Sequence, residues 1–223
     1  MMSNDRIARH SVAVRLVHWL FAVSGILLCI SGIGFMPLYG RFYVNELPGM
    51  AWVSDFNVQM TLHYVSAALF CATLFYHIVF HWRRREFAAW PRRGDLRESW
   101  LMVRALLTGT AEPPQGKFLA EQRLAYLAIG LTSLLLVGTG LVLSWKNAGP
   151  INPDAAFVQW MTLLHLGATF FFMALVAMHL LAFVPRINRA LLPTMFTGSV
   201  DRHYAEKRHA LWASQRSRER TGQ

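Results

Sequence analysis

Histidines inside uncharged apolar stretches are the residues of this sequence best suited to chemistry. His165 and His179 are 14 residues apart, close to four helical turns, so both project from one helix face about 21 Å apart along its axis. An ionisable side chain at membrane depth is costly and is usually functional. Neutral imidazole ligates haem iron when its second nitrogen is hydrogen-bonded. The spacing therefore indicates two stacked haems, each with two axial imidazoles.

The order of the apolar stretches pairs the histidines by depth. His63 lies near the start of the second stretch and His165 near the start of the fourth, and these two stretches run in the same direction. We predict that this pair holds an outer haem. For an inner haem, His179 has two candidate partners: His18 in the first stretch, and His77, which follows His63 by 14 residues. Spacing does not choose between them.

Four uncharged apolar stretches position these histidines, at residues 16–36, 58–82, 124–145 and 157–184. Each has about the 20 residues that a helix needs to cross a bilayer core. A chain of 223 residues that is 54% hydrophobic and only 15% charged suits a polytopic membrane protein. The sequence predicts an all-α, integral membrane four-helix bundle, with residues 1–223 forming a single domain.

The distribution of charge sets the orientation of these helices. A net charge of +10 is also typical of nucleic-acid binders. Of the 22 Lys and Arg, however, only Arg41 and Lys146 fall between the first and second or the third and fourth stretches. Under the positive-inside rule both termini, the loop at 83–123 and the basic tail at 186–223 are cytoplasmic. We expect a multi-pass protein of a bacterial inner membrane, with lipid and no nucleic acid as partner.

The cytoplasmic loop contains an amphipathic pattern. Apolar side chains recur at helical spacing among charged ones, at Leu96, Trp100, Val103, Leu106 and Leu107. We predict a short interfacial helix, which either lies on lipid headgroups or docks the anchoring segment of a partner. His10, His203 and His209 lie outside every stretch and are interpreted as solvated surface histidines.

The segment Arg15-Leu16-Val17-His18-Trp19 resembles the Arg-x-x-His-Trp opening of prokaryotic di-haem membrane cytochromes b. Over nearly its full length the chain resembles the gamma (cytochrome b) subunit of respiratory formate dehydrogenases. The resemblance implies two haem b, with His18 paired to His179 for the inner one. It also implies that electrons come from catalytic (alpha) and iron–sulfur (beta) subunits outside the membrane and reduce menaquinone or ubiquinone near the cytoplasm.

The same resemblance implies a quinone site just before the third stretch. The family pattern there is Asn-Ala-Gly-Gln, and this chain has Leu119, Ala120, Glu121 and Gln122. Ala120 and Gln122 fit the pattern, whereas Leu119 and Glu121 depart from it. Arg15 is a candidate for holding haem propionates at the inner face.

The sequence is also compatible with other functions, some of which require haems and some of which do not. With haems, the chain is the cytochrome b of a hydrogenase or thiosulfate reductase, or a stand-alone quinone-reactive cytochrome. Without them it is a transporter or scaffold, which the lack of Asp and Glu in the four stretches disfavours. No hydrolytic constellation is recognisable, so quinone reduction is the only chemistry expected here, and substrate oxidation belongs to a partner. Six glycines lie in or near helices where a flat macrocycle must approach the backbone, although helix packing is the commoner reason for any one of them: Gly25, Gly32, Gly34, Gly138, Gly140 and Gly167.

Overall fold

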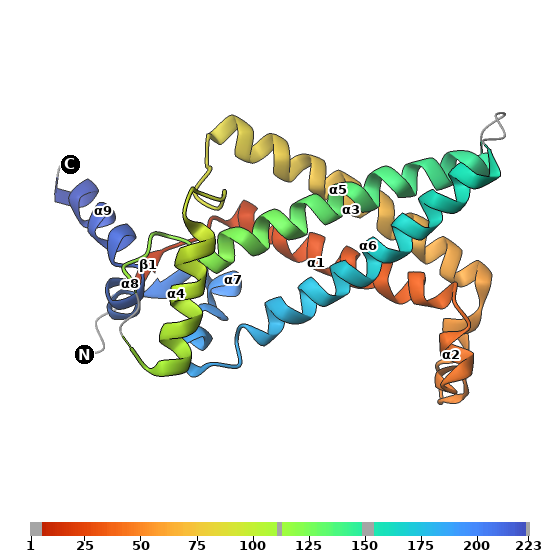
Figure 1. Ribbon diagram of the computed structural model, residues 1–223, viewed down its shortest axis with the longest axis horizontal. Helices are drawn as coiled ribbons and strands as arrows, with labels where there is room; N and C mark the ends of the chain where they lie inside the picture. Colours follow the sequence, from red (N-terminus) through yellow and green to blue (C-terminus); the bar gives the residue numbers. More distant parts are fainter. Residues whose placement is uncertain (1–5, 111–112, 149–153, 222–223) are drawn as a thin grey trace. The chain divides into compact units, whose positions relative to one another are not determined.

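Four long helices correspond to the four apolar stretches (Figure 1). The computed structural model describes residues 6–110, 113–148 and 154–221. The long helices are α1 (Val12–Gly34), α3 (Phe56–Arg84), α5 (Ala120–Ala148) and α6 (Ala155–Leu181). Each is long and apolar enough to cross a membrane. A helix satisfies its own backbone hydrogen bonds, which is the condition for crossing a lipid core. The predicted all-α membrane fold is confirmed.

The first turns of three long helices are capped by side chains. Ser11 Oγ accepts a hydrogen bond from Val14 N at 3.3 Å before α1. Asp55 Oδ1 accepts from Val58 N at 3.1 Å before α3, and Asp154 Oδ2 accepts from Phe157 N at 3.2 Å before α6. Such caps satisfy amide groups that have no partner within the helix.

The helices differ from the predicted stretches mainly at their ends. α1 begins at Val12 rather than 16, and α5 begins at Ala120 rather than 124. Arg15 and Arg123 lie in these extra turns, because hydropathy marks the lipid-facing part of a helix and not where the helix begins. α6 ends at Leu181, three residues before the predicted 184.

Contacts divide the chain into two compact units, which are described separately. The helical unit comprises residues 16–83 and 132–174, and the terminal unit comprises residues 1–15, 84–131 and 175–223.

Aromatic side chains from three helices pack together in the helical unit. The rings of Phe21 and Phe70 lie 4.3 Å apart between centroids, and Phe70 meets Phe172 edge-on at 6.2 Å. Gly25 makes room for them, since a Cβ there would lie 3.4 Å from Phe172. The connection from α1 to α3 folds into α2 (Leu38–Arg41), η1 (Val44–Glu46) and η2 (Ala51–Ser54).

Many large apolar side chains of the helical unit are exposed. Val65, Phe75 and Leu141 are 64%, 70% and 63% exposed. A water-soluble protein rarely exposes apolar surface on this scale, whereas contact with lipid is consistent with it.

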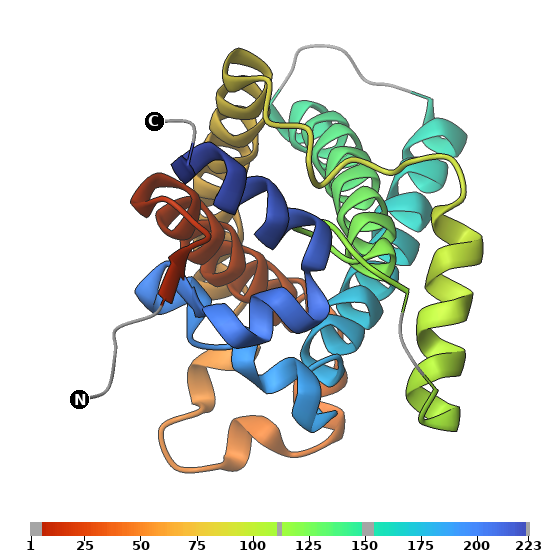
Figure 2. The same ribbon diagram turned by 90° about the vertical axis from the view of Figure 1, so that its left-hand side faces the viewer.

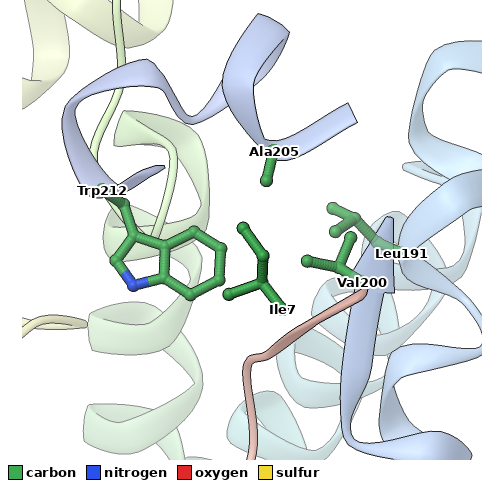
Figure 3. Close-up of a cluster of buried hydrophobic side chains, with 5 residues drawn as sticks. All are labelled: Ile7, Leu191, Val200, Ala205 and Trp212. Atoms are coloured by element: carbon green, nitrogen blue, oxygen red, sulfur yellow. The ribbon is translucent and has the colours of Figure 1, made fainter. Parts of the chain in front are cut away.

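The terminal unit brings residues from both ends of the sequence together. β1 (Arg6–Ala8) pairs antiparallel with β2 (Ser199–Asp201), with Ile7 opposite Val200. The short segments η3 (Arg186–Leu191), α7 (Thr194–Thr197), α8 (Arg202–Arg208) and α9 (Ala210–Thr221) are the blue parts of Figure 2. Apolar side chains of both strands and of η3, α8 and α9 form a buried cluster (Figure 3), made of Ile7, Leu191, Val200, Ala205 and Trp212.

Gly198 ends α7 with φ of 78°. A Cβ at this position would lie 2.8 Å from the carbonyl oxygen of His10. Only glycine therefore allows the N-terminal segment to approach this turn so closely.

The predicted interfacial helix is α4 (Asp95–Thr108) in the terminal unit. Asp95, Met102 and Ala105 form its buried side. The opposite side carries a stripe of exposed apolar residues, here called the α4 stripe: Leu96, Trp100, Val103 and Leu107.

Candidate functional site

His63 on α3 and His165 on α6 lie close together in the helical unit. Their ring centroids are 6.4 Å apart, and the ring planes are inclined by 63°. Both side chains are half-buried. Two imidazoles whose nitrogens each lie about 2 Å from one metal ion have ring centres about 6 Å apart. The sequence places these histidines at one depth, and the structure brings their rings to a separation that suits one metal ion.

A hydroxyl group orients each of these imidazoles. Ser31 Oγ lies 2.9 Å from His63 Nδ1, and Thr139 Oγ1 lies 2.8 Å from His165 Nδ1. Each hydroxyl donates its one hydrogen to a carbonyl of its own helix, Leu27 O at 2.8 Å and Leu135 O at 2.7 Å. A hydroxyl that donates its hydrogen to this carbonyl can only accept from the histidine, and on this ground we assign the ring hydrogen of both histidines to Nδ1.

This tautomer leaves the lone pair of each Nε2 available to a metal. A ligating imidazole typically donates its other N–H to an oxygen atom, which fixes the ring and increases its basicity. Sequence reasoning missed Ser31 and Thr139, because serine and threonine inside apolar helices commonly bond only to the backbone. The signal they left is that each hydroxyl residue is followed directly by glycine, Gly32 or Gly140.

These two glycines lie beside the histidine rings. A Cβ on Gly140 would lie 3.3 Å from His165 Cε1, and one on Gly32 would lie 3.9 Å from His63 Cε1. α1 and α5 thus present the same pair of features, a hydroxyl and a glycine, to α3 and α6.

The donor set suits a macrocyclic metal complex. Among the described residues, no three His, Cys, Asp or Glu side chains come together as a metal cage. Two imidazoles alone leave most coordination positions of iron unfilled, and a porphyrin supplies four of them. The residues present at His63 and His165 therefore fit a bis-histidine haem.

The other intramembrane histidines have different neighbours. His18 in the helical unit meets Trp19 edge-on at 5.3 Å between ring centroids, and His179 in the terminal unit meets Phe183 in the same way at 5.7 Å. His77 lies against His81, one turn further along α3, with centroids 4.5 Å apart.

Arg15 bonds within the terminal unit. Its Nη1 donates to the carbonyl oxygen of Phe196 in α7, and its guanidinium lies beside Gly198. This position joins the start of α1 to the tail.

Gln122 closes the first turn of α5. Its Oε1 accepts a hydrogen bond from Leu119 N at 3.1 Å. Arg123, one residue later, is bound in a bidentate ion pair to Asp95 of α4, with Nε–Oδ2 at 2.8 Å and Nη2–Oδ1 at 2.5 Å. The hydrogen bonds from Arg123 hold the pKa of the Asp95 carboxyl below its usual value.

His209 differs from the prediction of a solvated histidine. It is fully buried, whereas His203 is exposed as predicted. Its Nδ1 lies 2.8 Å from the carbonyl oxygen of Gly116, and burial, with Arg9 nearby, lowers its pKa to about 4. The sequence did not reveal this burial, because the residues just before His209 are charged and its partner Gly116 lies 93 positions away.

Comparisons with known proteins agree with a haem-binding membrane protein. The family profile described as prokaryotic cytochrome b561 matches residues 9–198, a range that contains His18, His63, His165 and His179 and ends before His209. A formate dehydrogenase cytochrome b556 subunit of Haemophilus influenzae is 21% identical over 217 residues. That match covers 95% of this chain and 84% of the relative.

Proposed function

The chain belongs to the prokaryotic cytochrome b561 family, and from this premise we propose that it is the di-haem b membrane subunit of a formate dehydrogenase-like complex. It passes electrons from an extracytoplasmic iron–sulfur subunit across the membrane to quinone near the cytoplasm. The observation that carries the proposal is the pairing of His63 and His165, 6.4 Å apart between centroids and each held by a hydroxyl.

At the outer site the chain's own residues fix the ligands. Haem b supplies a one-electron carrier whose potential depends on its axial ligands and their hydrogen bonds. Ser31 and Thr139 hold the two rings in one tautomer. The apolar helices around them exclude water and keep the local dielectric constant low.

At the inner site we assign the ligands as His18 and His179. The support is the Arg-x-x-His-Trp opening at 15–19 and the family match, which includes both positions. His77 is the competing ligand, since its spacing from His63 repeats that of His165 and His179.

Quinone reduction is assigned to the start of α5. Reducing one quinone to quinol takes two electrons, which arrive one at a time, and two protons. Ala120 and Gln122 keep the family pattern, while Leu119 and Glu121 replace its other two residues. The Glu121 carboxyl is the acid available at this turn to pass a proton from the cytoplasm.

The proposed partners are supported by the same relative, whose name is that of a formate dehydrogenase subunit. We propose an iron–sulfur (beta) subunit and a catalytic (alpha) subunit as partners, in a bacterial inner membrane. Residues 1–223 then act as a single membrane cytochrome domain with both termini in the cytoplasm, as the distribution of Lys and Arg favours.

The test is a dithionite-reduced minus oxidised spectrum with pyridine haemochrome quantitation on protein purified from cells with ample haem. We expect two haems per chain in the wild type and loss of the same one in His63→Ala and His165→Ala. His18→Ala should lose the other, and the matched variant His77→Ala should keep both. A haem-free wild type would overturn the proposal, and loss in His77→Ala alone would move the inner ligand to α3. Subunits that co-purify identify the electron donor.

A further inference from the structure

Four successive carbonyls in the loop before α5 each accept a hydrogen bond from a different residue. This segment, residues 113–119, is here called the pre-α5 loop. Leu211 N donates to Gln115 O at 3.1 Å, and His209 Nδ1 donates to Gly116 O at 2.8 Å. Arg9 Nη2 donates to Lys117 O at 2.5 Å, and Arg123 Nη1 donates to Phe118 O at 2.7 Å.

The donors come from three separate parts of the terminal unit. Arg9 directly follows β1, His209 and Leu211 belong to the tail at α8 and α9, and Arg123 is in α5. A loop that carries no regular secondary structure is ordered here by its backbone acceptors. The N-terminal segment and the tail thus fix the path of the chain as it enters α5.

His209 is built into this contact as a neutral donor. A carbonyl oxygen only accepts, so Nδ1 of His209 carries the hydrogen. The side chain is fully buried, and its Nε2 has no hydrogen-bond partner among the described residues. Burial and the nearby Arg9 disfavour the imidazolium, which keeps His209 neutral at physiological pH.

Arg9 is held with little freedom. It is 5% exposed, and its guanidinium carbon lies 5.6 Å from the ring centroid of Phe118 and 5.3 Å from that of Trp212. Stacking between two aromatic rings orients the planar guanidinium. Its Nη2 is therefore aimed at Lys117 O from a fixed position.

The loop leads directly into the turn where quinone is proposed to bind. Leu119 and Ala120 are 1% and 0% exposed, and Gln122 bonds back to Leu119 N. A shift of the loop backbone would therefore also move Glu121 and Gln122, because these residues follow the loop directly with no flexible segment between.

We infer that Arg9 and His209 are positioning residues for quinone: by holding the carbonyls of Lys117 and Gly116 they fix the pre-α5 loop and so the first turn of α5. The inference rests on the proposed function. Neither residue needs to touch quinone, and His209 lies outside the range matched by the family profile.

The test measures quinone dependence in the complex with its partner subunits, in membranes. Reoxidation of reduced haem is followed by stopped flow against the concentration of decylubiquinone or menadione. His209→Ala should raise KM for quinone, by at most roughly tenfold, because the energy of the one lost hydrogen bond to Gly116 is the upper limit of the effect. Haem content and the maximal rate should change little. His209→Asn, whose amide replaces the Nδ1 donor, should restore most of the affinity.

His203→Ala is the matched control, since it removes an exposed histidine from the same tail and should leave KM unchanged. Arg9→Gln, which breaks the bond to Lys117, provides a second variant. An unchanged KM in both His209→Ala and Arg9→Gln, with quinone activity intact in the wild type, overturns the inference alone. Loss of haem from both variants also overturns it, because the residues would then serve folding in general. A wild type that does not reduce quinone overturns the proposed function and the inference together.

Discussion

Ser31 and Thr139 are the two residues, besides the histidines themselves, that define the proposed haem site. Each accepts the Nδ1 hydrogen of a histidine while donating to its own helix. A single hydroxyl thereby sets both the tautomer and the orientation of the ring. Histidine position alone is visible in the sequence, whereas this orientation depends on helices packed side by side.

Removing either hydroxyl is expected to weaken the outer haem. Ser31→Ala or Thr139→Ala leaves a buried N–H without its acceptor and makes the imidazole less basic, so haem affinity should fall roughly tenfold to a hundredfold. The midpoint potential should rise, because a weaker donor stabilises ferric iron less. Potentiometric titration of the haem bands checks both.

Two controls separate this effect from packing. Thr139→Ser keeps the hydroxyl and should behave as wild type. Ser24→Ala removes an equally buried hydroxyl of α1 that bonds to Leu20 O at 2.7 Å, and it should leave both haems unchanged. A normal potential in Thr139→Ala would contradict the assigned role.

A methyl group at Gly140 is expected to turn the ring of His165. The added Cβ would lie 3.3 Å from Cε1 of that ring, close enough that the imidazole must shift by a few tenths of an ångström. Electron paramagnetic resonance of the oxidised protein, which reports ligand-plane orientation, should show a shifted low-spin signal for one haem in Gly140→Ala. Gly138→Ala, with nothing within 4 Å of its Cβ, should give the wild-type spectrum, and identical spectra for both variants would exclude the contact.

At the scale of elements, one buried ion pair ties α4 to α5. Asp95 and Arg123 have side chains 3% and 4% exposed, whereas Glu98, which also contacts Arg123 at 3.3 Å, is 46% exposed. Asp95→Ala removes the buried carboxylate and leaves the Arg123 guanidinium with only the half-exposed Glu98 as an ionic partner, at a cost of up to about 3–5 kcal/mol. Glu98→Ala should cost at most about 1 kcal/mol.

Hydrogen exchange followed by mass spectrometry measures this difference. Amides of α4 should exchange much faster in Asp95→Ala and at nearly the wild-type rate in Glu98→Ala. Equal protection in both variants would show that other contacts hold α4 in place.

The α4 stripe is expected to contact lipid. Leu107 in the stripe is 80% exposed, and the flanking Arg97 and Arg104 are also exposed, an arrangement that suits a helix lying on anionic headgroups. In a background with Cys29 and Cys71 replaced by alanine, a spin label at Leu107 should collide with oxygen, and one at Thr108 with a water-soluble nickel chelate. If a label at Leu107 in the complex collides with neither oxygen nor the nickel chelate, the α4 stripe instead contacts the anchoring segment of a partner.

The sequence predicted the four helices because uncharged stretches of this length have few alternatives in a membrane. It missed the first turns of α1 and α5, where Arg15, Glu121 and Arg123 continue the helix beyond the apolar part. It also missed β1, β2 and the short tail helices. Arg6 of β1 bonds to Ser199 of β2, 193 residues away, and no local pattern encodes such a contact.

At the scale of the whole molecule, His209 links folding of the terminal unit to pH. Its pKa is about 4 in the folded chain and about 6.5 in an unfolded one. A depressed histidine pKa gives stability that is fully present above pH 6.5 and is lost as the pH falls toward 4. The loss is at most roughly 3 kcal/mol.

Thermal unfolding between pH 7.5 and 4.5 tests this dependence. The wild type should lose more stability across that range than His209→Asn, which has no group to protonate, and His203→Ala should follow the wild type. If the unfolding temperature of His209→Asn falls with pH as much as that of the wild type, other groups cause the acid sensitivity.

The pairing of β1 with β2 has a consequence for biosynthesis. Arg6 bonds to the side chain and backbone of Ser199, both at 2.8 Å, so β1 has no strand partner until residue 201 has left the ribosome. By then all four long helices have been synthesised. The terminal unit therefore closes only after the four long helices have been synthesised, and a nascent chain that stalls before β2 leaves β1 without its strand partner.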